Sequence, residues 1–299
     1  MASSGDSTRQ EEKGQSSGHR AVLLVTSHHG QVLYRGIPLD YIDRTGHISV
    51  WNVAKMISSA VDVLCRCGYT EREAALTDTR RAFLVRQRLV ISPRLHSETS
   101  KIIDTNILVT ATAGKVGKSS RTSNAELRSS GSDVAFVKCA YTGVLFDTNI
   151  NRPVPYPKWF AEKYCSPLSY IDNSHIQAKK DMVSFPSNAH RTQLKVRHSD
   201  TDFNMHVANA EYLRYCMEAA TDASISGYFR HFSRDMCWYP VLELDIIYLA
   251  QSRPGEMLDV YTWQDEYDIQ AIYFSIHRDR TAIAVSAFKF GFGENTSHL

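Results

Sequence analysis

The sequence has no long apolar run, no strong excess of charge of either sign and no C-x-x-C pair. A membrane-spanning helix needs about 20 consecutive apolar residues, and no stretch approaches that length. The formal net charge of +2 over 299 residues is far from the basic excess typical of proteins that act on nucleic acid. We therefore expect neither a membrane span nor a nucleic-acid partner.

The six cysteines are scattered through the chain, without the ligand spacing of a structural zinc site. The first apolar run, at 21–25, is too short for the core of a signal peptide. Residues 1–20 are rich in Ser, Gly and Gln, which predicts a disordered tail. We expect a cytoplasmic protein with reduced thiols and neither a metal ion nor another cofactor.

With 43% hydrophobic residues, the chain can fill one large core or two of ordinary size. Its most informative segment is the polar stretch at 199–206. Alternating residues before it predict a strand, and a helix is predicted to start near Asn209, a residue type that caps helices. This stretch brings a carboxylate, an amide and an imidazole next to the free N–H groups of a helix start: Asp202, Asn204 and His206.

A weaker copy of this pattern lies 159 residues earlier. At that offset Asp43 aligns with Asp202 and His47 with His206, while Thr45 stands where Asn204 does. An apolar helix is predicted at 50–64, and a Gly-Tyr pair follows both helices. The shared offset predicts an internal duplication in which Asp43 and His47 form a degenerate counterpart of the second site.

Each predicted helix is followed by strand-like segments, at 82–91, 101–111 and 133–146 in the first copy and at 241–249, 257–263, 271–277 and 281–290 in the second. Long antiparallel strands after one helix predict a sheet that curls around that helix. The segment 114–132 has no counterpart in the second copy. It is basic and nearly free of apolar residues, so we predict a flexible hairpin loop there.

The motif S-D-x-D-x-N-x-H-V-x-N-x-x-Y-L-R-Y-x-x-E-A, from Ser199 to Ala219, resembles the signature of hotdog-fold thioesterases. The acyl-carrier-protein thioesterases and the 4-hydroxybenzoyl-CoA thioesterase group are the most similar. R-P-V-P-Y-P at 152–157 and R-P-G-E-M-L-D-V at 253–260 resemble further family segments. The resemblance is specific in the second copy and degenerate in the first, and together it covers 21–292.

The resemblance implies an α+β fold of two tandem hotdog domains, each an antiparallel sheet wrapped around a central helix. They are expected to form an intramolecular pseudo-dimer within a monomeric chain, and further self-association stays open. The expected organisation is a tail at 1–20, a first domain at 21–165 carrying the 114–132 insertion, a linker at 166–186, and a second domain at 187–299 with the active site.

The resemblance also implies hydrolysis of an acyl-CoA or acyl-carrier-protein thioester to a free acid and a thiol. Asp202 is expected to act as general base or nucleophile, Asn204 to orient the water or the thioester, and His206 to share in proton transfer. The backbone N–H groups of Val207 and Ala208 are candidate oxyanion donors. The carrier and the acyl chain length stay open.

Two other functions remain in consideration. Leu249 stands where the plant enzymes of this type carry an active-site glutamate, so the protein could bind acyl thioesters without cleaving them. Hotdog hydratases that act on enoyl thioesters use a motif resembling D-x-N-P-x-H. Only four positions separate Asp202 from His206 here, and no proline lies between them, which disfavours the hydratase.

Overall fold

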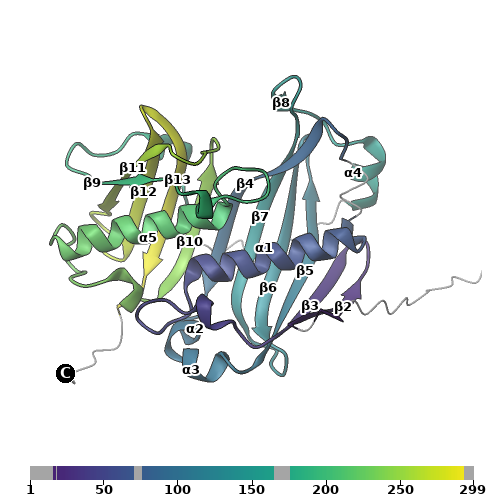
Figure 1. Ribbon diagram of the computed structural model, residues 1–299, viewed down its shortest axis with the longest axis horizontal. Coiled ribbons are helices and arrows are strands. Elements are labelled where there is room, and N and C mark those ends of the chain that lie inside the picture. Colours follow the sequence, from purple (N-terminus) through teal and green to yellow (C-terminus); the bar gives the residue numbers. More distant parts are fainter. Residues whose placement is uncertain (1–15, 18, 71–75, 165–175, 293–299) are drawn as a thin grey trace, which may run out of the picture.

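Two helices of 17 residues each, α1 (Val50–Arg66) and α5 (Asn209–Ile225), lie on one face of a continuous antiparallel sheet (Figure 1). The computed structural model describes residues 16–17, 19–70, 76–164 and 176–292. Among these residues, no helix is long and apolar enough to cross a bilayer. The expected tail therefore lies largely outside the described residues, although Ser16, Ser17 and Arg20 already belong to paired strands.

Both helices form because apolar residues recur every three or four positions and face the sheet. In α1 the buried side chains include Val53, Ile57, Val61 and Leu64, and in α5 they include Leu213, Cys216, Met217 and Ala220. A glycine in the left-handed region follows each helix, with φ of 102° at Gly68 and 76° at Gly227. The expected cap at Asn209 is wrong, because Ala208 occupies the cap position of α5 and Asn209 is the first helical residue.

The described residues form a sheet of 13 strands. In the first half of the chain, defined here as the described residues up to 164, they are β1 (Ser16–Ser17), β2 (Arg20–Val25), β3 (His29–Arg35), β4 (Arg80–Ile91), β5 (Asn106–Val116), β6 (Ser120–Ser129), β7 (Ala135–Asp147) and β8 (Arg152–Pro153). In the second half, from 176 to 292, they are β9 (His190–Lys195), β10 (Val241–Tyr248), β11 (Met257–Gln264), β12 (Ala271–Arg278) and β13 (Thr281–Phe290).

The strands lie in the order β1-β2-β3-β5-β6-β7-β4-β10-β13-β12-β11-β9, with β8 paired to β7 outside this path. From the centre outward, both halves repeat one order of five strands: the first strand after the helix, then the fourth, the third and the second, and then the strand before the helix. In the first half, β2 and β1 lie beyond these five. The halves join where β4 pairs with β10, from Val90 opposite Glu243 to Arg86 opposite Ile247.

The offset of 159 residues recurs in the backbone. The helices start at 50 and 209 and end at 66 and 225. Each is preceded by a short loop closed by one isolated bridge. This bridge joins Ile42 to Ile48 in the first elbow (residues 42–48) and Thr201 to Val207 in the second elbow (residues 201–207).

The segment 114–132 is not a flexible loop, and that prediction is wrong. Its first residues end β5, and 120–129 form β6, which pairs with β5 on one side and β7 on the other. Arg121, Ser123, Ala125 and Leu127 are buried on the face toward the helix layer. Small and polar residues at these alternate positions hide the strand signal, because the usual apolar alternation is missing.

Short helices complete the first half. Residues predicted to begin a strand at 101 instead belong to α3 (Thr99–Ile102), which follows α2 (Arg94–Ser97). The helix α4 (Lys158–Tyr164) buries Phe160 and Tyr164. The expected linker lies outside the described residues up to 175. From Ile176 the chain packs on the second half of the sheet, where Ile176 and Ala178 contact the cluster of Ala271, Val285 and Ala287.

Candidate functional site

The second elbow brings two of the predicted site residues into contact. The Asn204 backbone N–H donates to Asp202 Oδ1 at 2.8 Å, and Asn204 Nδ2 donates to Asp202 Oδ2 at 3.3 Å. Met205 follows in the left-handed region with φ of 60°. Asp202 is half-buried and Asn204 is exposed. The carboxylate is therefore oriented by its neighbour and still accessible from solvent.

His206 closes the same elbow through its backbone, because its carbonyl accepts a hydrogen bond from the Asp202 N–H at 2.9 Å. Its side chain is half-buried, and Nδ1 is a buried atom without a hydrogen-bond partner among the described residues. A buried polar atom of this kind carries an energetic cost unless a water or a ligand satisfies it. The imidazole is thus available to a bound molecule.

Asp200 anchors the elbow to α5. Its carboxylate accepts hydrogen bonds from Arg214 Nη2 at 2.8 Å, from the Tyr215 hydroxyl at 2.7 Å and from the Arg197 N–H at 2.9 Å. Burial, together with this carboxylate, raises the pKa of Tyr215 far above its ordinary value. Asp200 therefore holds the elbow against α5, and Asp202 takes no part in these contacts.

The two backbone N–H groups expected as oxyanion donors already have acceptors in the structure. The Val207 N–H donates to the Ser252 carbonyl at 2.9 Å, and the Ala208 N–H donates to the Asp200 carbonyl at 2.9 Å. Both amides are therefore already used. The next two amides, of Asn209 and Ala210, have no acceptor within the described part of the chain, as is usual in the first turn of a helix.

Sequence reasoning missed two polar residues beside this elbow. Ser252 is fully buried. Its Oγ and the Tyr212 hydroxyl make no hydrogen bond of ordinary length among the described residues, although the two groups lie close to each other. Burial raises the pKa of Tyr212, while the nearby Ser252 acts in the opposite direction. Neither residue belongs to the D-x-N-x-H pattern, and Ser252 is 50 positions from Asp202 in the sequence, so no local signal identified it.

No acidic side chain of β10 replaces the glutamate expected at Leu249. Asp245 is fully buried and bound by Arg86, whose Nε donates at 2.9 Å. Glu243 Oε2 accepts a hydrogen bond from the Ile176 N–H at 3.3 Å. Both carboxylates therefore serve contacts with β4 and with the chain that precedes the second half.

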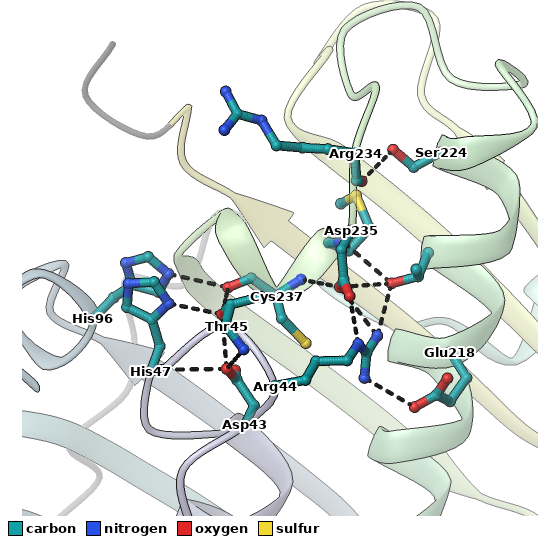
Figure 2. Close-up of polar contacts among 12 residues, drawn as sticks. Asp43, Arg44, Thr45, His47, His96, Glu218, Ser224, Arg234, Asp235 and Cys237 are labelled. Carbon is teal, nitrogen blue, oxygen red and sulfur yellow. Dashed lines mark hydrogen bonds and ion pairs between the residues drawn. The ribbon is translucent and has the colours of Figure 1, made fainter. Parts of the chain in front are cut away.

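The first elbow is a denser cluster than its copy (Figure 2). Asp43 Oδ1 accepts hydrogen bonds from the Thr45 N–H at 2.9 Å and the Thr45 hydroxyl at 2.7 Å. The same hydroxyl lies 2.8 Å from His47 Nδ1. The His47 ring stacks on His96 with a centroid distance of 3.6 Å. Thr45 thus connects Asp43 to His47, a role that the sequence comparison did not predict.

This first elbow is also covered by the second half of the chain. His96 Nε2 and Thr45 Oγ1 each lie 3.2 Å from the Cys237 carbonyl oxygen. Arg44 donates to Glu218 at 3.2 Å and forms a close ion pair with Asp235 (Figure 2). Phe203, at the equivalent position of the second elbow, is 90% exposed. The first elbow is therefore covered by the second half of the chain, whereas the second elbow is exposed to solvent.

A cavity of about 30 Å³ adjoins the first elbow, lined by residues that include Asp43, His96, Trp51, Met217 and Tyr239. This volume holds a water molecule and is far below the several hundred Å³ of ordinary ligand sites. Burial lowers the pKa of both His47 and His96, although Asp43 acts in the opposite direction. The two stacked imidazoles are thus held neutral.

Comparison with known proteins bears on the fold of the chain. Residues 196–292 match the model of the thioesterase-like superfamily. No curated protein matches the chain in sequence. Among solved structures, an acyl-ACP thioesterase from Bacteroides thetaiotaomicron is 14% identical with a TM-score of 0.65, and the match covers 88% of this chain and 97% of that one.

Two further structures are similar over most of their length. A protein named as an oleoyl thioesterase from Lactobacillus plantarum is 13% identical with a TM-score of 0.69, covering 91% of this chain and 98% of that one. The 12:0-ACP thioesterase from Umbellularia californica is 13% identical with a TM-score of 0.69, covering 88% and 96%. The resemblance to hotdog-fold thioesterases is therefore confirmed, and this chain shares their fold.

Proposed function

We propose that the protein is an acyl thioesterase whose working site is the second elbow. The observation that carries this proposal is the hydrogen-bonded pair of Asp202 and Asn204, which lies open to solvent at the start of α5. The match to the thioesterase-like superfamily includes this elbow and excludes the first one. The three solved structures described above, which share the fold, are named as thioesterases, and this also supports the proposal.

In this proposal Asp202 acts as general base. Asn204 occupies one lone pair on each carboxylate oxygen, which leaves the others to accept a proton from water. The water oxygen bonds to the thioester carbon, its proton passes to Asp202, and the carbon–sulfur bond breaks to release a thiolate. Because a thiolate is a good leaving group, water activated by this carboxylate is a sufficient nucleophile, and no nucleophilic side chain is needed. The thiolate then takes up a proton from His206, and the proton held by Asp202 replaces it on the imidazole. The products are a free acid and a thiol, and both side chains return to their starting states.

The remaining groups stabilise charge during this reaction. The amides of Asn209 and Ala210, at the positive end of the α5 dipole, are the donors we assign to the carbonyl oxygen. His206, with its unsatisfied Nδ1, is positioned to supply the proton to the departing sulfur. The hydroxyls of Tyr212 and Ser252 are available to the same bound molecule.

The proposed architecture is two tandem hotdog domains, 21–165 and 187–299, that form a pseudo-dimer within one chain. The repeated strand order and the pairing of β4 with β10 support this reading. One site is open, and its copy is covered by the contacts of Arg44 and Thr45 with the second half. The first elbow therefore acts as an interface between the halves.

The substrate we propose is an acyl thioester of coenzyme A or of an acyl-carrier protein. Free thiol is to be measured after purified protein is mixed with acyl-CoAs and acyl-carrier proteins of graded chain length. Asp202→Asn is expected to reduce turnover by roughly 10²–10⁴-fold, the usual contribution of one general base. Asp43→Asn is the matched control and should change turnover little. If Asp202→Asn keeps more than half of wild-type turnover, the chemistry lies elsewhere.

A second candidate is a protein that binds acyl thioesters without cleaving them. Leu249 favours it, because this side chain is 37% exposed at the end of β10 where a catalytic glutamate is expected. Binding of acyl-CoA without release of thiol, unchanged by Asp202→Asn, would support this candidate over the thioesterase.

A further inference from the structure

A buried arginine that has no ion-pair partner among the described residues lies inside the first half, away from both elbows. Arg121 on β6 is only 6% exposed and faces the helix layer. Its Nη1 donates to Thr70 Oγ1 at 2.6 Å. Within the described residues, no carboxylate lies within ion-pair distance of its guanidinium. Buried charges in proteins are nearly always paired, so this guanidinium is exceptional.

Three buried hydroxyl groups lie close to Arg121, those of Tyr69, Ser123 and Tyr141. None makes a hydrogen bond of ordinary length within the described part of the chain, and the Ser123 hydroxyl lies close to those of both tyrosines. Ser123 lies two residues beyond Arg121 on the same face of β6, directly opposite Tyr141 on β7. Tyr69 comes from the segment that follows α1. Gly143, opposite Arg121, has no side chain to cover the guanidinium. We refer to Tyr69, Arg121, Ser123 and Tyr141 as the Arg121 cluster.

The fold does not require this cluster. The equivalent inner face of the second half, on β12 and β13, carries fully buried apolar residues that include Ile272, Phe274 and Phe288. An unsatisfied buried hydroxyl destabilises the folded state, and an unpaired buried charge does so more strongly. Several such groups lying close together are best explained by a bound molecule that satisfies them together.

The ligand chemistry follows from these groups. A guanidinium binds a carboxylate through two parallel hydrogen bonds, and a single positive charge balances a single negative one. Burial raises the pKa of Tyr69 and Tyr141 above the ordinary value, while the Arg121 charge acts in the opposite direction on both. Both tyrosines are therefore neutral hydrogen-bond donors at neutral pH.

The surroundings are apolar. Val116, the other strand partner of Arg121, belongs to a hydrophobic cluster with Leu145, Tyr156 and Phe160. A ligand seated on Arg121 would thus extend into hydrocarbon surroundings. We propose that the Arg121 cluster is a second binding site, which takes the carboxylate of a free fatty acid.

This site is distinct from the candidate active site. Asp43 and His47 precede α1, whereas Tyr69 and Thr70 follow it, and 17 helical residues span about 25 Å. Asp202 lies in the other half of the sheet. The site can therefore be tested without reference to thioester hydrolysis.

The test is thermal unfolding of the full chain with decanoate as probe and decanol as the neutral molecule of equal length. Decanoate should raise the unfolding temperature of the wild type, since a ligand that binds only the folded state stabilises it. Arg121→Met should remove this rise and should itself leave the ligand-free protein as stable or more stable, because it removes an unpaired buried charge. Tyr141→Phe should weaken decanoate binding about tenfold.

Two controls separate the site from other effects. Arg128→Met alters the same strand at a residue paired with Asp133 at 2.9 Å, and the decanoate effect should persist in it. It should also persist in Asp202→Asn. The proposal is overturned if decanol stabilises the protein as much as decanoate does, or if Arg121→Met retains the decanoate effect. A lower unfolding temperature of ligand-free Arg121→Met would likewise overturn it, because the guanidinium would then have an internal partner.

Discussion

Thr45 and Asn204 occupy equivalent positions in the two elbows but make different contacts. Asn204 binds only its own aspartate, Asp202, whereas the Thr45 hydroxyl joins Asp43 to His47 and reaches the Cys237 carbonyl oxygen. The first elbow lacks the amide but keeps a hydrogen-bond network, which connects the halves of the chain. Its aspartate is part of that network, whereas the aspartate of the second elbow is accessible to solvent.

The sequence predicts contacts within an elbow better than contacts across the fold. The role of Asp200 as a partner of Arg214 was predictable, because the two residues share one loop and the following helix. The hydrogen bond from the Val207 N–H to the Ser252 carbonyl was not, because it joins segments brought together only by the sheet. For the same reason, the sequence did not identify Ser252 as a residue beside the site.

The stacked imidazoles of His47 and His96 predict a pH effect on stability. Burial lowers the pKa of both in the folded state, so below the unfolded value of about 6.5 the unfolded chain binds more protons. The free energy of unfolding should therefore fall as the pH decreases through 6.5. Urea unfolding at pH 7.5 and pH 5.5 measures this loss, and in the variant His47→Gln/His96→Gln it should be smaller.

Other charged groups near the pair bear on the interpretation. Asp43 faces both rings and favours their protonation, and the ion pair of Arg44 with Asp235 lies beside them. The single variants His29→Gln and His277→Gln are the matched controls, since burial lowers the pKa of these histidines as well. An equal loss of stability in the double variant and the wild type would show that the stacked pair does not contribute.

At the scale of single elements, β6 shows where pattern reading fails. The helices were predictable from apolar periodicity, with α1 expected at 50–64 and found at Val50–Arg66. β6 was predicted as a loop because its inward residues include Arg121 and Ser123 in place of a regular apolar series. The polar groups that obscured the strand are those assigned above to ligand binding.

Deletion of 114–132 tests the position of β6. The strand lies between β5 and β7 and pairs with both, so its removal leaves each of them without one of its two partners and exposes the core around Leu127. The deleted protein should be insoluble or lack a cooperative unfolding transition by circular dichroism. Replacing the turn residues 130–132 with glycines is the control and should preserve folding. A soluble, cooperatively folded deletion variant would restore the loop interpretation.

At the scale of the whole molecule, the halves are joined by more than strand pairing. Asp245 on β10 is fully buried, and it accepts hydrogen bonds from Arg86 on β4 and from the Ala178 N–H at 3.1 Å. On the other face, Arg44 binds Glu218 and Asp235. A buried ion pair that loses one partner is strongly destabilising, so neither half can be removed without exposing an uncompensated charge.

We therefore expect that residues 187–299 produced alone will not form a stable monomer. The fragment would expose the edge of β10 along Leu244 and Ile246, which are buried in the full chain, and unpaired strand edges promote association. Size-exclusion chromatography with light scattering should find aggregates or dimers. Co-expression with residues 1–186 is the control, and it should restore a soluble one-to-one complex because it supplies β4 and Arg86. A monomeric fragment with wild-type thioester hydrolysis would contradict the pseudo-dimer, since the second half would then need no partner to complete its sheet.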